Sequence, residues 1–184
     1  ARSVVKLRNI EAQATKRYWQ KYYRDAGYPG TSRREPKVPI NQALNAGSLF
    51  LSGIILRWVL YHRLSPQHGF LHIQSSYPSL VYDLMEPFRF IIEDATLLAC
   101  QEATDEKKLV GLAIDNIKRS LEQTVYIPAT RQQVYRKSTI HGIVLALRAY
   151  LIGDMQRFVI PVEGEKRGGR PLKISYRLPG EIKN

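Results

Sequence analysis

Apolar residues recur at helical spacing through most of this 184-residue chain, and proline and glycine separate the segments that show the pattern. No stretch alternates apolar and polar residues for long enough to predict a sheet. We therefore expect a mainly α-helical, compact fold of several helices. The segments expected to be helical are 3–26, 40–64, 79–103, 105–123 and 131–152.

Pro87 lies inside the helical pattern of residues 79–103. A proline inside a helix removes a backbone donor and usually kinks the helix. We therefore expect a bend directly after Asp83 and Glu86, so that these two acids end a helical turn.

The domain organisation follows from length and composition. We expect one helical domain over residues 1–160, followed by a basic tail, 161–184, that is rich in glycine and proline. The tail contains one short strand-like run, 172–178, so it is either a flexible arm or an edge hairpin. The apolar run 46–60 is shorter than the roughly 20 residues of a membrane-spanning helix, so we expect a buried helix and no membrane association.

The single cysteine, Cys100, excludes an internal disulfide and a cysteine-based zinc finger. It fits a reducing compartment. No charged and then apolar leader is visible at the start of the chain, so we expect a cytoplasmic protein.

The charge of the chain favours a nucleic-acid partner. Lys and Arg number 28 against 16 Asp and Glu, a net charge of +12, as expected of a surface that neutralises phosphates. Aromatic residues interleave with basic ones in 16–24, where the rings either stack on bases or face the core; for Trp19 we favour the core. The candidate phosphate contacts are Lys16, Arg17, Arg33, Arg34, Lys37, Arg89, Lys166, Arg167 and Arg170.

Asp83 and Glu86 are the carboxylates with the most suggestive surroundings. They are three residues apart and project from one face if the segment is helical. Their neighbours are largely apolar, and burying an unpaired carboxylate costs several kcal/mol unless a cation compensates it. That cation is either a divalent metal ion or Arg89.

Other site types are not supported. His68 and His72 have the spacing of a helical zinc pair, but Gly69 lies between them and the glutamate of a zinc-protease motif is missing. No phosphate-binding glycine loop with its lysine is present, nor a serine in a nucleophile-elbow setting.

Three separate segments resemble one known family. They are IEAQATKRYW at 10–19, PINQALNAG at 39–47 and GFLHIQSSYPSLVYDLMEPFR at 69–89, in the right order. The chain is similar here to the CRISPR-associated protein one family, the integrases and endonucleases of CRISPR adaptation. The resemblance covers roughly residues 10–161. The residues after LN read AGSLFLSGIIL here, whereas the family usually has GYSLLY-like residues.

The resemblance implies a metal-dependent DNA integrase and endonuclease, which joins donor DNA 3′ ends to a repeat by transesterification. It implies that Glu11, His72 and Asp83 hold Mg²⁺ or Mn²⁺ and that Glu86 is an acidic neighbour that assists catalysis. His68 has no counterpart in the family.

The family also implies partners and a cellular setting. We expect CRISPR-associated protein two as a partner, a homodimer in the full-length protein, and a prokaryotic cytoplasm. The family's amino-terminal β-rich domain has no counterpart in this chain. Two alternatives stay open: a noncatalytic basic helical module that binds nucleic acid, and a scaffold domain whose acids pair with Arg89.

Overall fold

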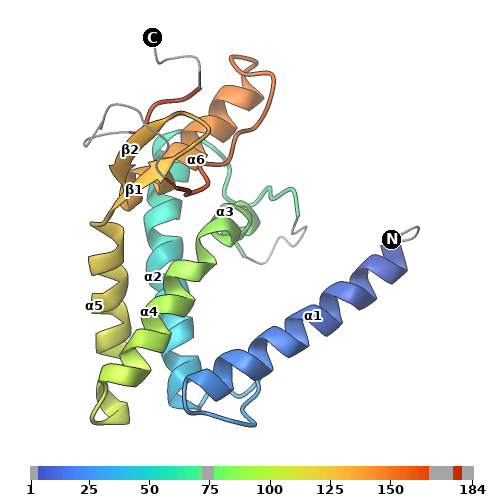
Figure 1. The fold of residues 1–184 in the computed structure, drawn as a ribbon. Coiled ribbons are helices and arrows are strands. Elements are labelled where there is room, and N and C mark those ends of the chain that lie inside the picture. Colours follow the sequence, from blue (N-terminus) through green and yellow to red (C-terminus); the bar gives the residue numbers. More distant parts are fainter. Residues whose placement is uncertain (1–3, 72–76, 166–175, 180–184) are drawn as a thin grey trace.

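The computed structural model describes residues 4–71, 77–165 and 176–179, except for the side chains of 4–8 and 11 (Figure 1). The fold is mainly α-helical, as expected. Its elements are α1 (Val4–Asp25), α2 (Pro39–Tyr61), α3 (Ser79–Met85), the 3₁₀ turn η1 (Glu86–Phe88), α4 (Arg89–Glu102), the 3₁₀ turn η2 (Glu106–Lys108), α5 (Leu109–Leu121), β1 (Thr124–Ile127), β2 (Gln132–Tyr135) and α6 (Arg136–Leu151).

Helix α2 is the centre of the core and packs against α3, α4, α5 and α6. Leu51, Ile55 and Val59 bury one of its faces completely. A Cβ atom at Gly47 would lie 2.7 Å from the side chain of Ile92, so only glycine allows α2 and α4 this close. Among the described helices, α2 alone is long and apolar enough to cross a membrane by length and composition, a property that central core helices share.

The bend expected at Pro87 is present. Helix α3 ends at Met85, η1 carries the proline, and α4 starts at Arg89. The bend separates two helices that both bury apolar faces against α2. It also places Glu86 at the first position of the turn instead of inside a continuous helix.

The expectation that no sheet forms, with a helix starting at 131, was wrong. Strands β1 and β2 form an antiparallel hairpin in which Val125 pairs with Val134 and Ile127 with Gln132. Arg131, at the turn, has a φ of 52°, which is uncommon for a residue with a side chain. The strands bury Val125, Ile127 and Val134 together with Tyr176, so the hairpin has a small core of its own.

Part of the basic tail is attached to this hairpin. The Gln132 side chain donates to the carbonyl of Arg177 (2.7 Å) and accepts the backbone N–H of Arg177 (2.9 Å). The Tyr176 ring lies against Gly142 of α6, where an added Cβ atom would come within 2.3 Å of the ring. Most of the expected strand 172–178, together with Lys166, Arg167 and Arg170, lies outside the described residues.

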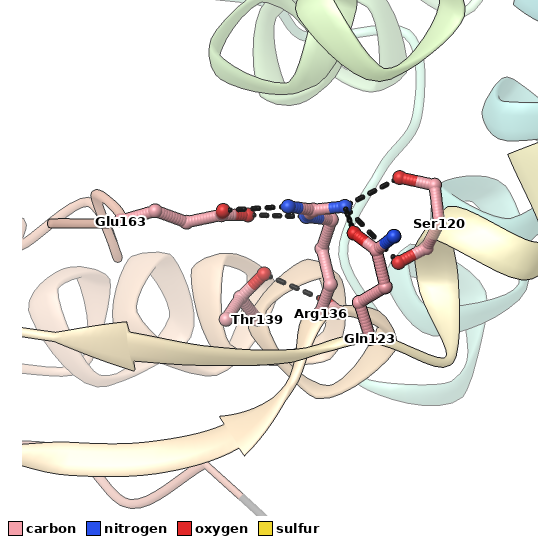
Figure 2. Close-up of polar contacts among 5 residues, drawn as sticks. All are labelled: Ser120, Gln123, Arg136, Thr139 and Glu163. Carbon is pink, nitrogen blue, oxygen red and sulfur yellow. Dashed lines mark hydrogen bonds and ion pairs between the residues drawn. The ribbon is translucent and has the colours of Figure 1, made fainter. Parts of the chain in front are cut away.

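Arg136 joins three segments at the start of α6 (Figure 2). Its Nε and Nη2 donate to the two carboxylate oxygens of Glu163, at 2.6 and 2.9 Å. Its Nη1 donates to the carbonyl of Ser120 (3.1 Å) and to Oε1 of Gln123 (2.8 Å). One planar guanidinium thus links the end of α5, the start of α6 and the segment that follows α6.

The change Arg136→Lys is expected to lower the free energy of unfolding by about 2 kcal/mol, because an ammonium group cannot keep both forked contacts of a mostly buried guanidinium. Urea unfolding of the two proteins measures the difference. The control is Lys137→Gln, which breaks the exposed pair with Glu122 and is expected to cost less than about 1 kcal/mol. Equal midpoints for Arg136→Lys and wild type would show that the network does not hold these segments together.

Candidate metal and nucleic-acid site

Asp83 holds the segment that leads to His72. It lies on α3 and is 3% exposed. Its Oδ2 atom accepts the backbone N–H groups of Phe70 (2.5 Å) and Leu71 (2.8 Å). A carboxylate that accepts two backbone donors fixes both the donors and its own orientation. The chain immediately before His72 is therefore attached to α3.

Glu86 is in a different environment from Asp83, although both come from the same motif. Its carboxylate accepts Nη1 of Arg89 at 3.0 and 3.3 Å. The side chains of Glu86 and Arg89 are 37% and 42% exposed, so solvent and ligands reach this carboxylate. One of the two interpretations of this motif was an ion pair with Arg89. That ion pair is present, and its acid is Glu86.

The other two expected ligands are not fully described. His72 and the side chain of Glu11 lie outside the described residues, so the convergence of Glu11, His72 and Asp83 stays a prediction. Figure 1 shows that the carboxyl-terminal end of α1 is joined to the helical bundle, whereas its amino-terminal half stands away from α3 and α4. Among the described residues, no three His, Cys, Asp or Glu side chains gather in a group suited to a metal ion.

A group of aromatic residues holds the carboxyl-terminal half of α1 in place. The Tyr18 hydroxyl donates to the carboxylate of Glu93, and the Tyr22 hydroxyl donates to the backbone carbonyl of Glu93 (2.8 Å). Burial, followed by the contact with Glu93, raises the pKa of Tyr18, so this phenol keeps its proton and remains a donor. The Tyr23 hydroxyl donates to Oδ1 of the buried Asn41 (2.5 Å) on α2. The direction of α1 is set by these contacts with α2 and α4.

A basic pocket of about 1140 Å³ lies between α1 and the loop 29–34. Arg33 spans it, with its guanidinium carbon 5.9 Å from the Trp19 ring centre and Nη2 donating to Asn45 Oδ1 (2.7 Å). Burial lowers the pKa of Arg33, as expected of a cation enclosed by protein. The pocket-lining cations and rings are Lys16, Arg24, Arg33, Arg34, Trp19 and Tyr23.

The pocket brings together three of the predicted phosphate contacts: Lys16, Arg33 and Arg34. Arg17 and Lys37 are exposed but are not among its lining residues. Arg24 was missed by the sequence analysis, although its spacing of eight residues from Lys16 places both on one face of a helix. Trp19 packs partly against the core, as expected, and also forms a wall of the pocket.

The family model and the curated relatives that match this chain belong to the same family. The family model described as CRISPR associated protein Cas1 matches residues 1–109. A CRISPR-associated endonuclease Cas1 of Thermus thermophilus is 36% identical over 103 residues, which cover 54% of this chain and 33% of the relative. One of Archaeoglobus fulgidus is 28% identical over 180 residues, which cover 88% of this chain and 51% of the relative. The chain thus spans between a third and about half of these relatives' length.

A solved structure described as a casposase bound to integration product superimposes with a TM-score of 0.72. The match covers 88% of this chain and 54% of that chain, at 22% sequence identity. At this identity the likeness shows a shared fold.

Proposed function

This chain belongs to the Cas1 family of CRISPR-associated proteins, and from that premise we propose that it is the nuclease and integrase part of a metal-dependent enzyme of CRISPR adaptation. The reaction is the joining of donor DNA 3′ ends to a target by transesterification. The observation that carries the proposal is the buried Asp83 carboxylate, which attaches the segment before His72 to the helix that precedes Glu86.

The donor set supports a hard divalent ion. Two carboxylates and an imidazole suit Mg²⁺ or Mn²⁺, and the imidazole favours Mn²⁺. We assign Glu11, His72 and Glu86 to the ion, because the Glu86 carboxylate is accessible whereas Asp83 is buried and uses Oδ2 for two backbone N–H groups. In this assignment Asp83 positions His72; Asp83 as a direct ligand, as the family resemblance implied, is the alternative.

A bound divalent ion would activate the attacking hydroxyl or water and neutralise charge on the reacting phosphate. The chain's own residues then have separable tasks. Asp83 fixes residues 70 and 71, and Arg89 orients the Glu86 carboxylate through two hydrogen bonds. The basic pocket between α1 and residues 29–34 binds the phosphates of a DNA strand.

The proposal extends to the assembly of the longer protein. Its partners are DNA and CRISPR-associated protein two, and the full-length protein forms a homodimer. The cellular setting that we propose is a prokaryotic cytoplasm. Its support is that the named relatives are Cas1 endonucleases of prokaryotes.

The scaffold alternative has one supporting contact, the Glu86–Arg89 pair. Exposed pairs of this kind contribute between 0 and about 1 kcal/mol, which is too little to explain the motif by stability alone. The noncatalytic binding module is supported by the basic pocket, and it predicts DNA binding that is independent of divalent metal.

Mn²⁺ titration tests the proposed site directly. Isothermal titration of wild type is expected to show one saturable site, and Glu11→Gln is expected to weaken it at least tenfold, because a ligand charge is removed. The matched control is Glu122→Gln, which removes a carboxylate that pairs with Lys137 and is expected to leave the titration unchanged. DNA binding by all three proteins is measured in parallel. Identical Mn²⁺ isotherms for wild type and Glu11→Gln would favour the noncatalytic module.

A further inference from the structure

A second group of cations and rings lies on α2 and α6, at the far end of α2 from the basic pocket. The Arg57 guanidinium carbon is 4.6 Å from the Trp58 ring centre. The His141 ring stacks on Trp58, with centroids 3.8 Å apart and planes 16° apart. The Nε2 atoms of His62 and His141 lie 2.8 Å apart, so the two imidazoles share one hydrogen bond. These contacts fix the Trp58 ring between α2 and α6, and the exposed Arg57 guanidinium lies against this ring.

The cations of this surface are Arg57 and Arg148. Among the described residues, no ion pair involves Arg57 or Arg148, whereas Lys137, also on α6, pairs with Glu122. Among the described residues, the charged side chains that act on the pKa values of the two imidazoles are Arg57 on α2 and Arg148 on α6, and the Tyr61 ring contacts His62. None of these is a carboxylate.

The electrostatics of the histidine pair reflect this excess of positive charge. Burial, then the neighbouring His62 and Arg57, lowers the pKa of His141 to about 4. Burial and Arg148 lower the pKa of His62. Both imidazoles are therefore mostly neutral at pH 7, and the two guanidiniums produce a positive potential that an external anion would balance.

We propose that this α2–α6 surface (Arg57, Trp58, His62, His141 and Arg148) binds the phosphodiester backbone of DNA at a second position, separate from the basic pocket. The inference rests on the proposed function, because it requires that the chain binds DNA. Arg57, on the face of Trp58, supplies an exposed guanidinium for one phosphate, and Arg148 supplies a second. The exposed ring of Tyr61, at 72% exposure, borders the surface and can pack against sugars or bases.

The two DNA-binding positions are too far apart to share a phosphate. Arg33 of the basic pocket bonds to Asn45, and Arg57 lies twelve residues further along the same helix. At 1.5 Å per residue that is about 18 Å along the axis of α2. Figure 1 shows α1 and α6 at opposite ends of α2. The chain thus has separate positions for two stretches of DNA, which an enzyme that joins one DNA to another requires.

The experiment measures binding of a 30-base-pair duplex against salt concentration for wild type and for the double variant Arg57→Gln/Arg148→Gln. The slope of log affinity against log salt is expected to become shallower by about 0.9 for each phosphate that the variant no longer neutralises, with affinity falling roughly tenfold at 0.1 M salt. The control is Lys118→Gln/Lys137→Gln, whose lysines have carboxylate partners, and its slope is expected to match wild type. Circular dichroism confirms that the variants fold.

Proton uptake gives an independent readout. A bound phosphate favours the protonated imidazole and raises its pKa, so DNA binding takes up protons and affinity rises as the pH falls from 7 to 5. His141→Gln is expected to flatten that pH dependence.

The outcomes separate the two proposals. If wild type does not bind the duplex, the proposed function fails. If wild type binds and Arg57→Gln/Arg148→Gln keeps both its slope and its affinity, the α2–α6 surface does not bind DNA while the proposed function stands.

Discussion

Replacing Glu86 with glutamine is expected to lower the rate of DNA strand transfer by about a thousandfold, equivalent to roughly 4 kcal/mol of transition-state stabilisation. The substitution keeps the size of the side chain and removes the accessible charge that we assign to the ion. DNA affinity is expected to stay within about twofold of wild type, because the basic pocket is built from α1 and residues 29–34. A labelled 3′-end joined to a target duplex in Mn²⁺ measures the rate.

The control for Glu86→Gln is Glu122→Gln, which removes a charge of the same sign from an exposed ion pair. Its strand transfer is expected to equal that of wild type. Strand transfer at the wild-type rate by Glu86→Gln would contradict the assignment and return the ligand role to Asp83.

Asp83→Ala is expected to lower the free energy of unfolding by about 3 kcal/mol and to reduce strand transfer at least a hundredfold. The change leaves the backbone N–H groups of Phe70 and Leu71 without their buried acceptor, and each unsatisfied group costs about 1–3 kcal/mol. The segment before His72 then loses its attachment to α3. Urea unfolding and the strand-transfer assay measure the two effects.

Asp83→Asn distinguishes a positioning role from direct metal ligation. The asparagine carbonyl oxygen still accepts both N–H groups, so stability is expected to return to within about 1 kcal/mol of wild type and strand transfer to within about tenfold. Hydrogen exchange at the amides of residues 70 and 71 reports whether the attachment persists. If Asp83→Asn is as stable as wild type but as inactive as Asp83→Ala, then the Asp83 charge itself contacts the ion.

The helices could be predicted because apolar residues recur at helical spacing over long segments. Proline and glycine, which restrict or loosen the backbone, mark where these segments end or bend. Pro87 marked the bend, and α2 begins at Pro39, one residue before the helix expected over 40–64. The hairpin was missed because its strands have only four residues each, too few for alternation to show. Its turn contains Arg131 in a left-handed conformation. Glycine or asparagine at this position would have indicated a turn in the sequence, but arginine does not.

The ligand set stays a prediction, but the structure shows that the two acids of the motif have different surroundings. Asp83 and Glu86 look equivalent in the sequence, since both stand in an apolar helical segment. Their difference arises from the backbone of residues 70 and 71, whose N–H groups reach Asp83 from a loop. In the same way, His62 and His141 are 79 residues apart, and no local pattern shows that their rings meet.

The tyrosine contacts of α1 lie in its carboxyl-terminal half, so a small tilt there displaces the amino-terminal half by a larger distance. Among the described side chains, Tyr18 is the first along α1 that bonds to another helix, and Glu11 lies seven residues before it, about 10 Å along the axis. A tilt of roughly 10° at the attachment displaces residue 11 by roughly 2 Å, which is as long as a bond from Mg²⁺ to oxygen. If Glu11 binds the ion as proposed, the stiffness of a few tyrosine contacts sets how precisely the helix positions residue 11, nearly two turns away.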